Sequence, residues 1–332
     1  MRGDISRRSA VATAACCFTP QVGHAFLPSS PPFSPRLDAN SLTPLSTYDV
    51  PSVSSDLRYP RWLQGTWRVS NTITRFSMPL GSAFVDSFTR ATAQEDVDAA
   101  QTLSYLLKFD ETLLPSESDP ELCVAQDRRF NAVEETGAFL SGEGLVVADG
   151  SYQVNEQHPH GRIDLVVRDP DAIGDSRAAA SASRQDSTTT RIELSIEWAA
   201  WDAAASGGAF VTSELAVQRV MLPPDQYFSE SAVDTSFLEI ITRFEKPQRI
   251  MRAGGANNSH RRPTTVVRAR NRLVQYLSLP GIDTLDKGAT KRSRGLERLA
   301  AGRAVSFFDY DWVMELVEPD GRSLNLGSPL RA

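Results

Sequence analysis

The chain has 332 residues, with 35 Lys and Arg against 41 Asp and Glu, which gives a net charge of −6. This acidic balance argues against a nucleic-acid partner, because affinity for a phosphate backbone comes from clustered positive charge. No uninterrupted apolar run approaches the roughly 20 residues that a helix needs to cross a bilayer. The hydrophobic content of 41% is enough to bury a sizeable core.

The N-terminal residues 1–58 have the composition of a targeting leader and a disordered linker. Arg7 and Arg8 precede a short apolar stretch that ends near the small-residue site Gly23-His24-Ala25, the layout of a cleaved signal sequence. We therefore expect the folded domain to begin near residue 59, with no ordered contacts for residues 1 to about 50. A tail without targeting value is the simplest alternative.

A second signal follows the first. From Ile5 to Leu37 there is no Asp or Glu, and the Ser- and Pro-rich segment 29–36 has the composition of a plastid transit peptide. The stretch Ala25-Phe26-Leu27-Pro28 resembles the presequences of algae whose plastids descend from a red alga, which carry a Phe after the signal cleavage site. Read instead as a twin-arginine signal, the segment 6–11 would direct export to a thylakoid lumen or a periplasm. We expect a plastid (chloroplast) location, with stroma and thylakoid lumen both open.

The remainder of the chain alternates apolar and polar residues with a period of two, the pattern of half-buried strands. In the first such segment, for example, Trp67, Val69 and Ile73 alternate with polar neighbours. The segments with this pattern are 67–74, 103–109, 162–168, 191–198, 214–218, 238–244, 267–273 and 308–316.

These segments predict an all-β fold, because no helices alternate with them as a parallel sheet requires. We expect an antiparallel β-barrel of about 8–10 strands, closed or nearly closed, which removes exposed sheet edges. One short helix is predicted within 127–140, and Leu296 and Leu299 have helical spacing in a basic loop. Three loop insertions are expected near 171–190, 247–263 and 283–303, within a single domain of residues 59–332.

Several short stretches of the body resemble, in the same order, an uncharacterised family of cyanobacterial and plastid proteins, domain of unknown function 6816. The resemblance includes Gln218, Tyr227 and Glu230, and implies a photosynthetic lineage without any assigned activity. The stretches are Tyr59–Val69, Met78–Gly81, Asp127–Asn131, Gly137–Leu140 and Phe210–Glu214.

The triplet Gly65-Thr66-Trp67 resembles the Gly-x-Trp opening of lipocalins. In that family the Gly permits close approach of the chain, and the Trp plugs the closed end of the barrel. The resemblance implies a lipocalin-like (calycin-like) barrel whose first strand begins here.

Catalytic and metal chemistry is poorly supported. Cys123 is the one cysteine outside the leader, and its apolar neighbours make it most simply a small buried side chain. His158 and His160 could bind a metal together with Glu156, yet loop histidines are more often solvated.

Pairs of acidic residues at 127, 134 and 135 or at 214 and 239 could serve in acid–base catalysis, yet such pairs arise by chance in an acidic chain. No phosphate-binding or dinucleotide motif occurs. We therefore expect that the protein is not an enzyme and that it binds no cofactor and no metal ion.

The leading functional hypothesis is a non-enzymatic plastid β-barrel that binds a small apolar ligand such as a lipid or pigment. Trp67, Phe308, Tyr310 and Trp312 are the candidate interior residues, because large aromatic side chains on inward positions can line a ligand cavity. The alternative is an interior filled by the protein's own side chains. An enzyme acting on a lipid or pigment in the same barrel is a third hypothesis.

The alternative function is an accessory or assembly factor of photosynthetic membranes that acts through surface contacts. Arg268, Arg270 and Arg272 share one face of a predicted strand, with apolar residues on the other face. Their partner would be a thylakoid protein or an anionic membrane surface, unless the acidic stretch 86–127 neutralises them. As surface residues, all three should tolerate replacement by Gln within about 1 kcal/mol.

Overall fold

The computed structural model describes residues 33–44, 57–114, 121–155, 158, 160–170, 189–203, 208–221, 233–251, 263–277, 300 and 302–317. Two α-helices occur in this part of the chain, α2 (Ser87–Asp98) and α3 (Arg128–Leu140). Neither helix is long and apolar enough to cross a membrane. The strands are β1 (Gly65–Ser77), β2 (Thr102–Leu114), β3 (Glu121–Gln126), β4 (Val146–Gln153), β5 (Arg162–Arg168), β6 (Thr190–Ala203), β7 (Phe210–Met221), β8 (Val233–Phe244), β9 (Gln248–Met251), β10 (Pro263–Tyr276) and β11 (Ser306–Val317).

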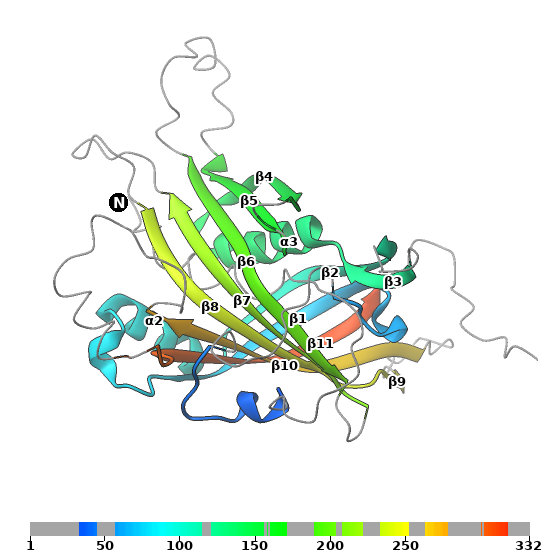
Figure 1. The fold of residues 1–332 in the computed structure, drawn as a ribbon, viewed down its shortest axis with the longest axis horizontal. Helices are drawn as coiled ribbons and strands as arrows, with labels where there is room; N and C mark the ends of the chain where they lie inside the picture. The colour runs from blue at the N-terminus through cyan, green and yellow to red at the C-terminus, as the bar shows by residue number, and fades with distance from the viewer. Residues whose placement is uncertain are drawn as a thin grey trace, which may run out of the picture.

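The described strands form one sheet in the order β3-β2-β1-β11-β10-β8-β7-β6-β5-β4, with β9 beside β10. Every pairing is antiparallel, and the sheet curls into a half-barrel (Figure 1). The predicted all-β, barrel-like fold is confirmed, with eleven strands in place of eight to ten. The sheet is more open than we expected, because β3 and β4 are its two ends and do not pair with each other in the described chain.

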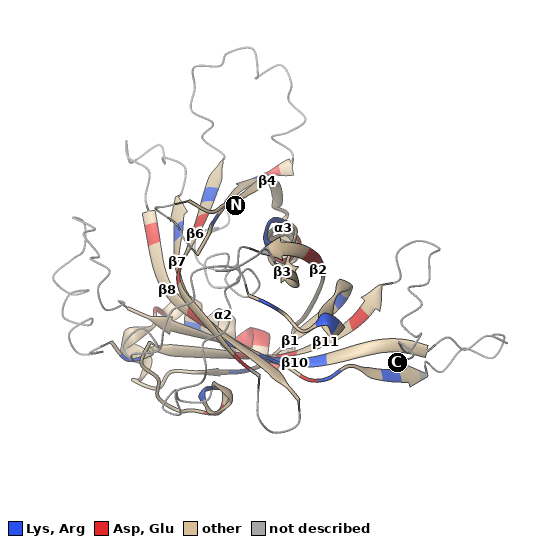
Figure 2. Ribbon diagram, turned by 45° about the vertical axis from the view of Figure 1, so that its right-hand side comes forward, with Lys and Arg blue, Asp and Glu red and all other residues tan. Residues whose placement is uncertain are grey.

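Helix α3 lies on the concave side of the sheet, between the β2–β3 and β4–β5 ends (Figure 2). The Asp127 side chain caps its first turn by accepting a hydrogen bond from the Phe130 amide at 3.0 Å. The Asn131 side chain accepts from the Lys108 amide at 2.7 Å and donates to the Lys108 carbonyl at 3.2 Å. Arg129 donates to the Gly150 carbonyl. Because Lys108 is on β2 and Gly150 on β4, the helix connects the two ends of the open sheet.

The sheet buries apolar side chains on both faces. The inner, concave face forms the larger core, which includes Trp67, Leu107 and Met314. A second core lies on the outer face and includes Val211 and Ile241. Burial on both faces explains why β7 is buried continuously over its first nine residues, whereas a strand with one solvated face would alternate.

The outer core is covered by a short N-terminal segment, residues 33–44, which we call the strap. Phe33, Leu37 and Leu42 are buried in this core, and the Phe33 ring meets Trp198 edge to face at 6.5 Å. The prediction that residues 1 to about 50 make no ordered contacts is therefore wrong for the strap. Its Ser- and Pro-rich composition is typical of unfolded segments, and it is ordered through packing against the sheet.

Helix α2 was not predicted, because it is mostly polar and lacks a clear apolar stripe. Its one buried side chain is Ala93, and the Asp86 side chain caps it by accepting from the Phe88 and Thr89 amides. Within the expected insertion 247–263, residues 248–251 form β9 and pair with the start of β10. Residues 252–262 of that insertion, nearly all of 171–190 and most of 283–303 lie outside the described residues.

Candidate ligand site in the half-barrel interior

The structure places the four candidate interior residues on the inner face of two neighbouring strands. Trp67 is on β1, and Phe308, Tyr310 and Trp312 are on β11, all in the inner core. Trp67 is 1% exposed, and its indole N–H donates to the Leu63 carbonyl at 2.6 Å. Position 65 requires glycine, because its φ of +124° is rarely adopted by other residues and an added Cβ would lie 2.8 Å from Leu316 Cδ1.

A cavity of about 200 Å³ lies between α2, the C-terminal end of α3 and strands β1, β2 and β11. We call it the α2 pocket. Phe308 and Tyr310 line it, whereas Trp67 and Trp312 do not. Its other apolar walls are Ile73, Phe88, Ala93, Leu103, Ala138 and Phe139. Sequence reasoning missed the walls supplied by α2 because it missed the helix.

The α2 pocket also has polar lining, which includes Asp96 on α2 and Glu143 after α3. No Lys or Arg of the described residues lines it. Burial raises the pKa of the Tyr310 hydroxyl, and three carboxylates raise it further: Glu135, Asp96 and Asp309. The hydroxyl of Tyr310, one of the lining residues, therefore stays neutral and able to donate a hydrogen bond.

Polar side chains lie among the apolar ones on the inner face beyond the pocket. Asn71 donates to the Tyr105 hydroxyl at 3.2 Å, and that hydroxyl is 3.3 Å from the Glu135 carboxylate. Asn271 donates to Thr242 Oγ1 at 2.8 Å. These groups come from β1, β2, α3, β10 and β8. They could have been found in the sequence, because Asn71 and Asn271 occupy positions where the period of two places apolar residues.

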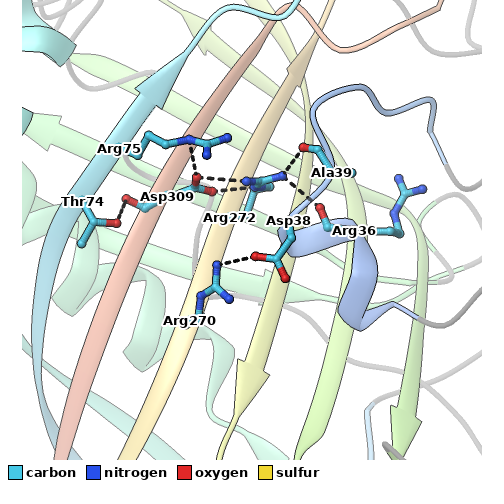
Figure 3. Close-up of polar contacts among 8 residues, drawn as sticks. All are labelled: Arg36, Asp38, Ala39, Thr74, Arg75, Arg270, Arg272 and Asp309. Atoms are coloured by element: carbon cyan, nitrogen blue, oxygen red, sulfur yellow. Dashed lines mark hydrogen bonds and ion pairs between the residues drawn. The ribbon is translucent and has the colours of Figure 1, made fainter.

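The three arginines proposed for docking do not form one exposed surface, as Figure 3 shows for two of them. Arg268 is exposed. The Arg270 side chain is 46% exposed and forms an ion pair with Asp38 of the strap at 2.9 Å. Arg272 is 1% exposed, because the strap covers it. The docking surface is thus reduced to Arg268 and Arg270.

Arg272 is part of a buried polar network. Its Nε and Nη2 donate to the two carboxylate oxygens of Asp309 at 2.5 and 3.0 Å, and Nη1 donates to the carbonyls of Arg36 and Ala39 at 3.0 and 2.7 Å (Figure 3). Its guanidinium also lies 4.8 Å from the centre of the Phe307 ring. Sequence analysis missed Asp309 as the counter-ion because it lies 37 residues away, on the next strand of the sheet.

Metal ligation finds no geometric support in the described chain, where no three His, Cys, Asp or Glu side chains gather to hold an ion. Glu156, one of the three ligands considered above, lies outside the described residues. Cys123 is half-buried, and its thiol contacts the Thr112 carbonyl at 3.6 Å.

Comparison with known proteins identifies the family. Neither the curated proteins nor the solved structures contain a significant match to the chain. A family model described as a domain of unknown function (DUF6816) matches residues 51–277. The match includes α2, α3 and β1 to β10, whereas the strap and β11 lie outside it. The family resemblance noted in the sequence is confirmed, and the chain belongs to the DUF6816 family.

Proposed function

We propose that this protein is a non-enzymatic plastid protein that binds a small, largely apolar ligand in the α2 pocket. The observation that carries the proposal is the pocket itself, which is lined by Phe308, Tyr310 and Ile73. Ligand sites in proteins are concave, mostly apolar and have a few polar groups that fix orientation. The α2 pocket is concave and combines apolar and aromatic walls with polar groups in roughly equal measure. The inner face beside it is filled by the protein's own side chains.

The plastid location is supported by the leader alone. The acid-free stretch from Ile5 to Leu37 and the Phe after the small-residue site are the features that favour it. Replacing Phe26 by Ala is expected to block entry into isolated plastids of a red-lineage alga, measured by protease protection of the imported chain. Normal import of this variant would remove the proposed lineage without affecting the ligand proposal.

Ligand binding is tested by filling the pocket. Ala93 lines it from α2 and is 5% exposed, so a Phe at this position places a ring in the cavity. We expect protein purified from its native plastid to carry a ligand in near-stoichiometric amount, detected by organic extraction and mass spectrometry. The Ala93→Phe variant, purified in the same way, should carry only a small fraction of this ligand.

Ala91→Phe is the matched control, because Ala91 is on the same helix and exposed. It should keep the ligand. If wild-type protein carries no ligand, or if both variants retain it equally, the α2 pocket is not the binding site.

The alternative, an accessory factor of photosynthetic membranes, keeps one supporting observation. Arg268 and Arg270 are exposed side by side on the outer face of β10, away from the α2 pocket. Ala93→Phe separates the two functions, because membrane association through the outer face would survive the loss of ligand.

A further inference from the structure

Several buried polar atoms on the inner face have no hydrogen-bond partner within the described part of the chain, among them the side-chain oxygen and nitrogen of Gln218 on β7. Three of these atoms belong to residues next to the α2 pocket: Asn71 Oδ1, Asn271 Oδ1 and Trp312 Nε1. All three side chains are at most 2% exposed. A buried polar atom without a partner costs free energy, so in native proteins such atoms are nearly always bonded to water or to a bound molecule. We call these three residues the Asn–Trp cluster.

The cluster lies next to the α2 pocket on the same face of the sheet. Asn71 is two residues from Ile73 on β1, and Trp312 is two residues from Tyr310 on β11, so both are one inward position beyond a pocket wall. Such a step along a strand is about 7 Å. Asn271 is paired directly with Tyr310 from the other side.

The register brings the cluster together across three adjacent strands. Asn71 and Trp312 are directly opposite each other in the β1–β11 pairing. Asn271 is paired with Tyr310, the preceding inward residue on β11, so it is diagonal to Trp312. The centre of the Trp312 ring is 6.3 Å from that of Phe244 on β8.

The chemistry of the three atoms selects their ligand. The indole N–H can only donate, so it needs an acceptor oxygen, whereas each amide oxygen needs a donor. A hydroxyl group can accept from the indole N–H and donate to one of the two amide oxygens, and it still satisfies an amide whose oxygen and nitrogen are exchanged. A carboxylate can only accept, and none of the three atoms carries a positive charge to stabilise a buried anion.

We propose that the Asn–Trp cluster binds the hydroxyl group of a neutral alcohol whose apolar body occupies the α2 pocket. This inference rests on the proposed function, because it specifies the chemical class of ligand for the same site. It distinguishes uncharged lipid or pigment alcohols from fatty-acid anions of the same chain length.

The test compares decanol with decanoate, which have the same number of carbons and differ in the polar end. We expect delipidated wild-type protein to bind decanol at least about tenfold more tightly than decanoate at neutral pH, measured by isothermal titration calorimetry. Trp312→Phe removes the N–H and keeps an aromatic ring, and should weaken decanol binding about tenfold, the effect of one buried hydrogen bond.

Trp201→Phe is the matched control, because Trp201 packs against the inner core from β6 and does not line the pocket. It should leave decanol affinity within about twofold. A second measurement does not depend on any variant: decanol should shift the indole N–H resonance of Trp312 in the nitrogen–proton NMR spectrum of the wild-type protein.

The outcomes separate the two proposals. If Ala93→Phe abolishes decanol binding while Trp312→Phe and the Trp312 resonance show no effect, the pocket binds ligand and the hydroxyl inference is wrong. Equal affinities for decanol and decanoate would also show that the hydroxyl inference is wrong. If the wild-type protein binds neither compound and its Trp312 resonance does not move, water alone fills the cluster and both proposals fail.

Discussion

Replacing Arg272 by Gln is expected to lower the free energy of unfolding by about 3 kcal/mol. Removing one partner of a buried ion pair costs about 3–5 kcal/mol, because it leaves the other charge uncompensated. The lower end applies here, since the half-exposed Arg75 also contacts Asp309, at 3.2 Å. The change also removes both hydrogen bonds that hold the strap carbonyls. Equilibrium unfolding in urea measures the effect.

Arg268→Gln is the matched control on the same face of the same strand. Because Arg268 is exposed, its replacement should change stability by no more than about 0.5 kcal/mol. Equal effects of the two substitutions would show that Arg272 is not a buried structural residue. The expectation from sequence that all three arginines are surface residues is wrong for Arg272, and the tolerance of Gln at Arg268 stays a prediction.

Replacing Trp67 by Ala is expected to cost about 3–5 kcal/mol, the range for truncating a large aromatic side chain in a core. Trp67 is 1% exposed and belongs to the inner core, so its removal leaves a cavity that the rigid sheet cannot fill. It also removes the donor to the Leu63 carbonyl. Thermal unfolding of the wild-type protein and the Trp67→Ala variant in the same buffer measures the difference in stability.

Trp67→Phe separates packing from hydrogen bonding at this position. This variant keeps most of the ring volume, so it should lower the free energy of unfolding much less than Trp67→Ala does. A loss of less than about 1 kcal/mol for the Ala variant would mean that Trp67 is not a core residue at the start of the first strand.

Eight of the eleven strands could be predicted, because alternation reports a local property of the chain, whereas β3, β4 and β9 were missed. In β1, β5 and β11 the inward residues are the apolar ones of the sequence pattern, as with Val69, Ile163 and Met314, apart from Asn71 on β1. The sheet order could not be read in this way. Strand β11 follows β10 in sequence yet also pairs with β1, and such long-range pairing depends on contacts that no local window contains.

The strap and the role of Arg272 could not be predicted, for a related reason. The period of two assigns Arg272 to the outer face correctly, but it cannot say whether another segment covers that face. Arg36 shows the same difficulty. It looks like a leader residue by composition, yet it forms hydrogen bonds with the buried Glu239 carboxylate at 2.6–3.0 Å.

The candidate site was predicted in part. The aromatic residues of β11 were placed on the inner face by pattern alone, and two of them, Phe308 and Tyr310, line the α2 pocket. The polar groups of the interior were not predicted, because an apolar interior was expected. Asn71 and Asn271 nevertheless interrupt the series of apolar inward residues on β1 and β10. The sequence of helix α2 has no apolar stripe with helical periodicity. The residues with which α2 lines the pocket could therefore not be predicted.

The strap has a consequence for how a leader would be removed. A processing peptidase that cut after Phe33 would detach the ring that packs on Trp198, and a cut after Arg36 would also take the guanidinium away from Glu239. If a leader is removed, a mature chain that keeps these contacts would begin before Phe33, although the acid-free composition typical of a transit peptide continues to Leu37. Residues 33–37 would then serve twice, first as the end of an unfolded import signal and afterwards as part of the folded core.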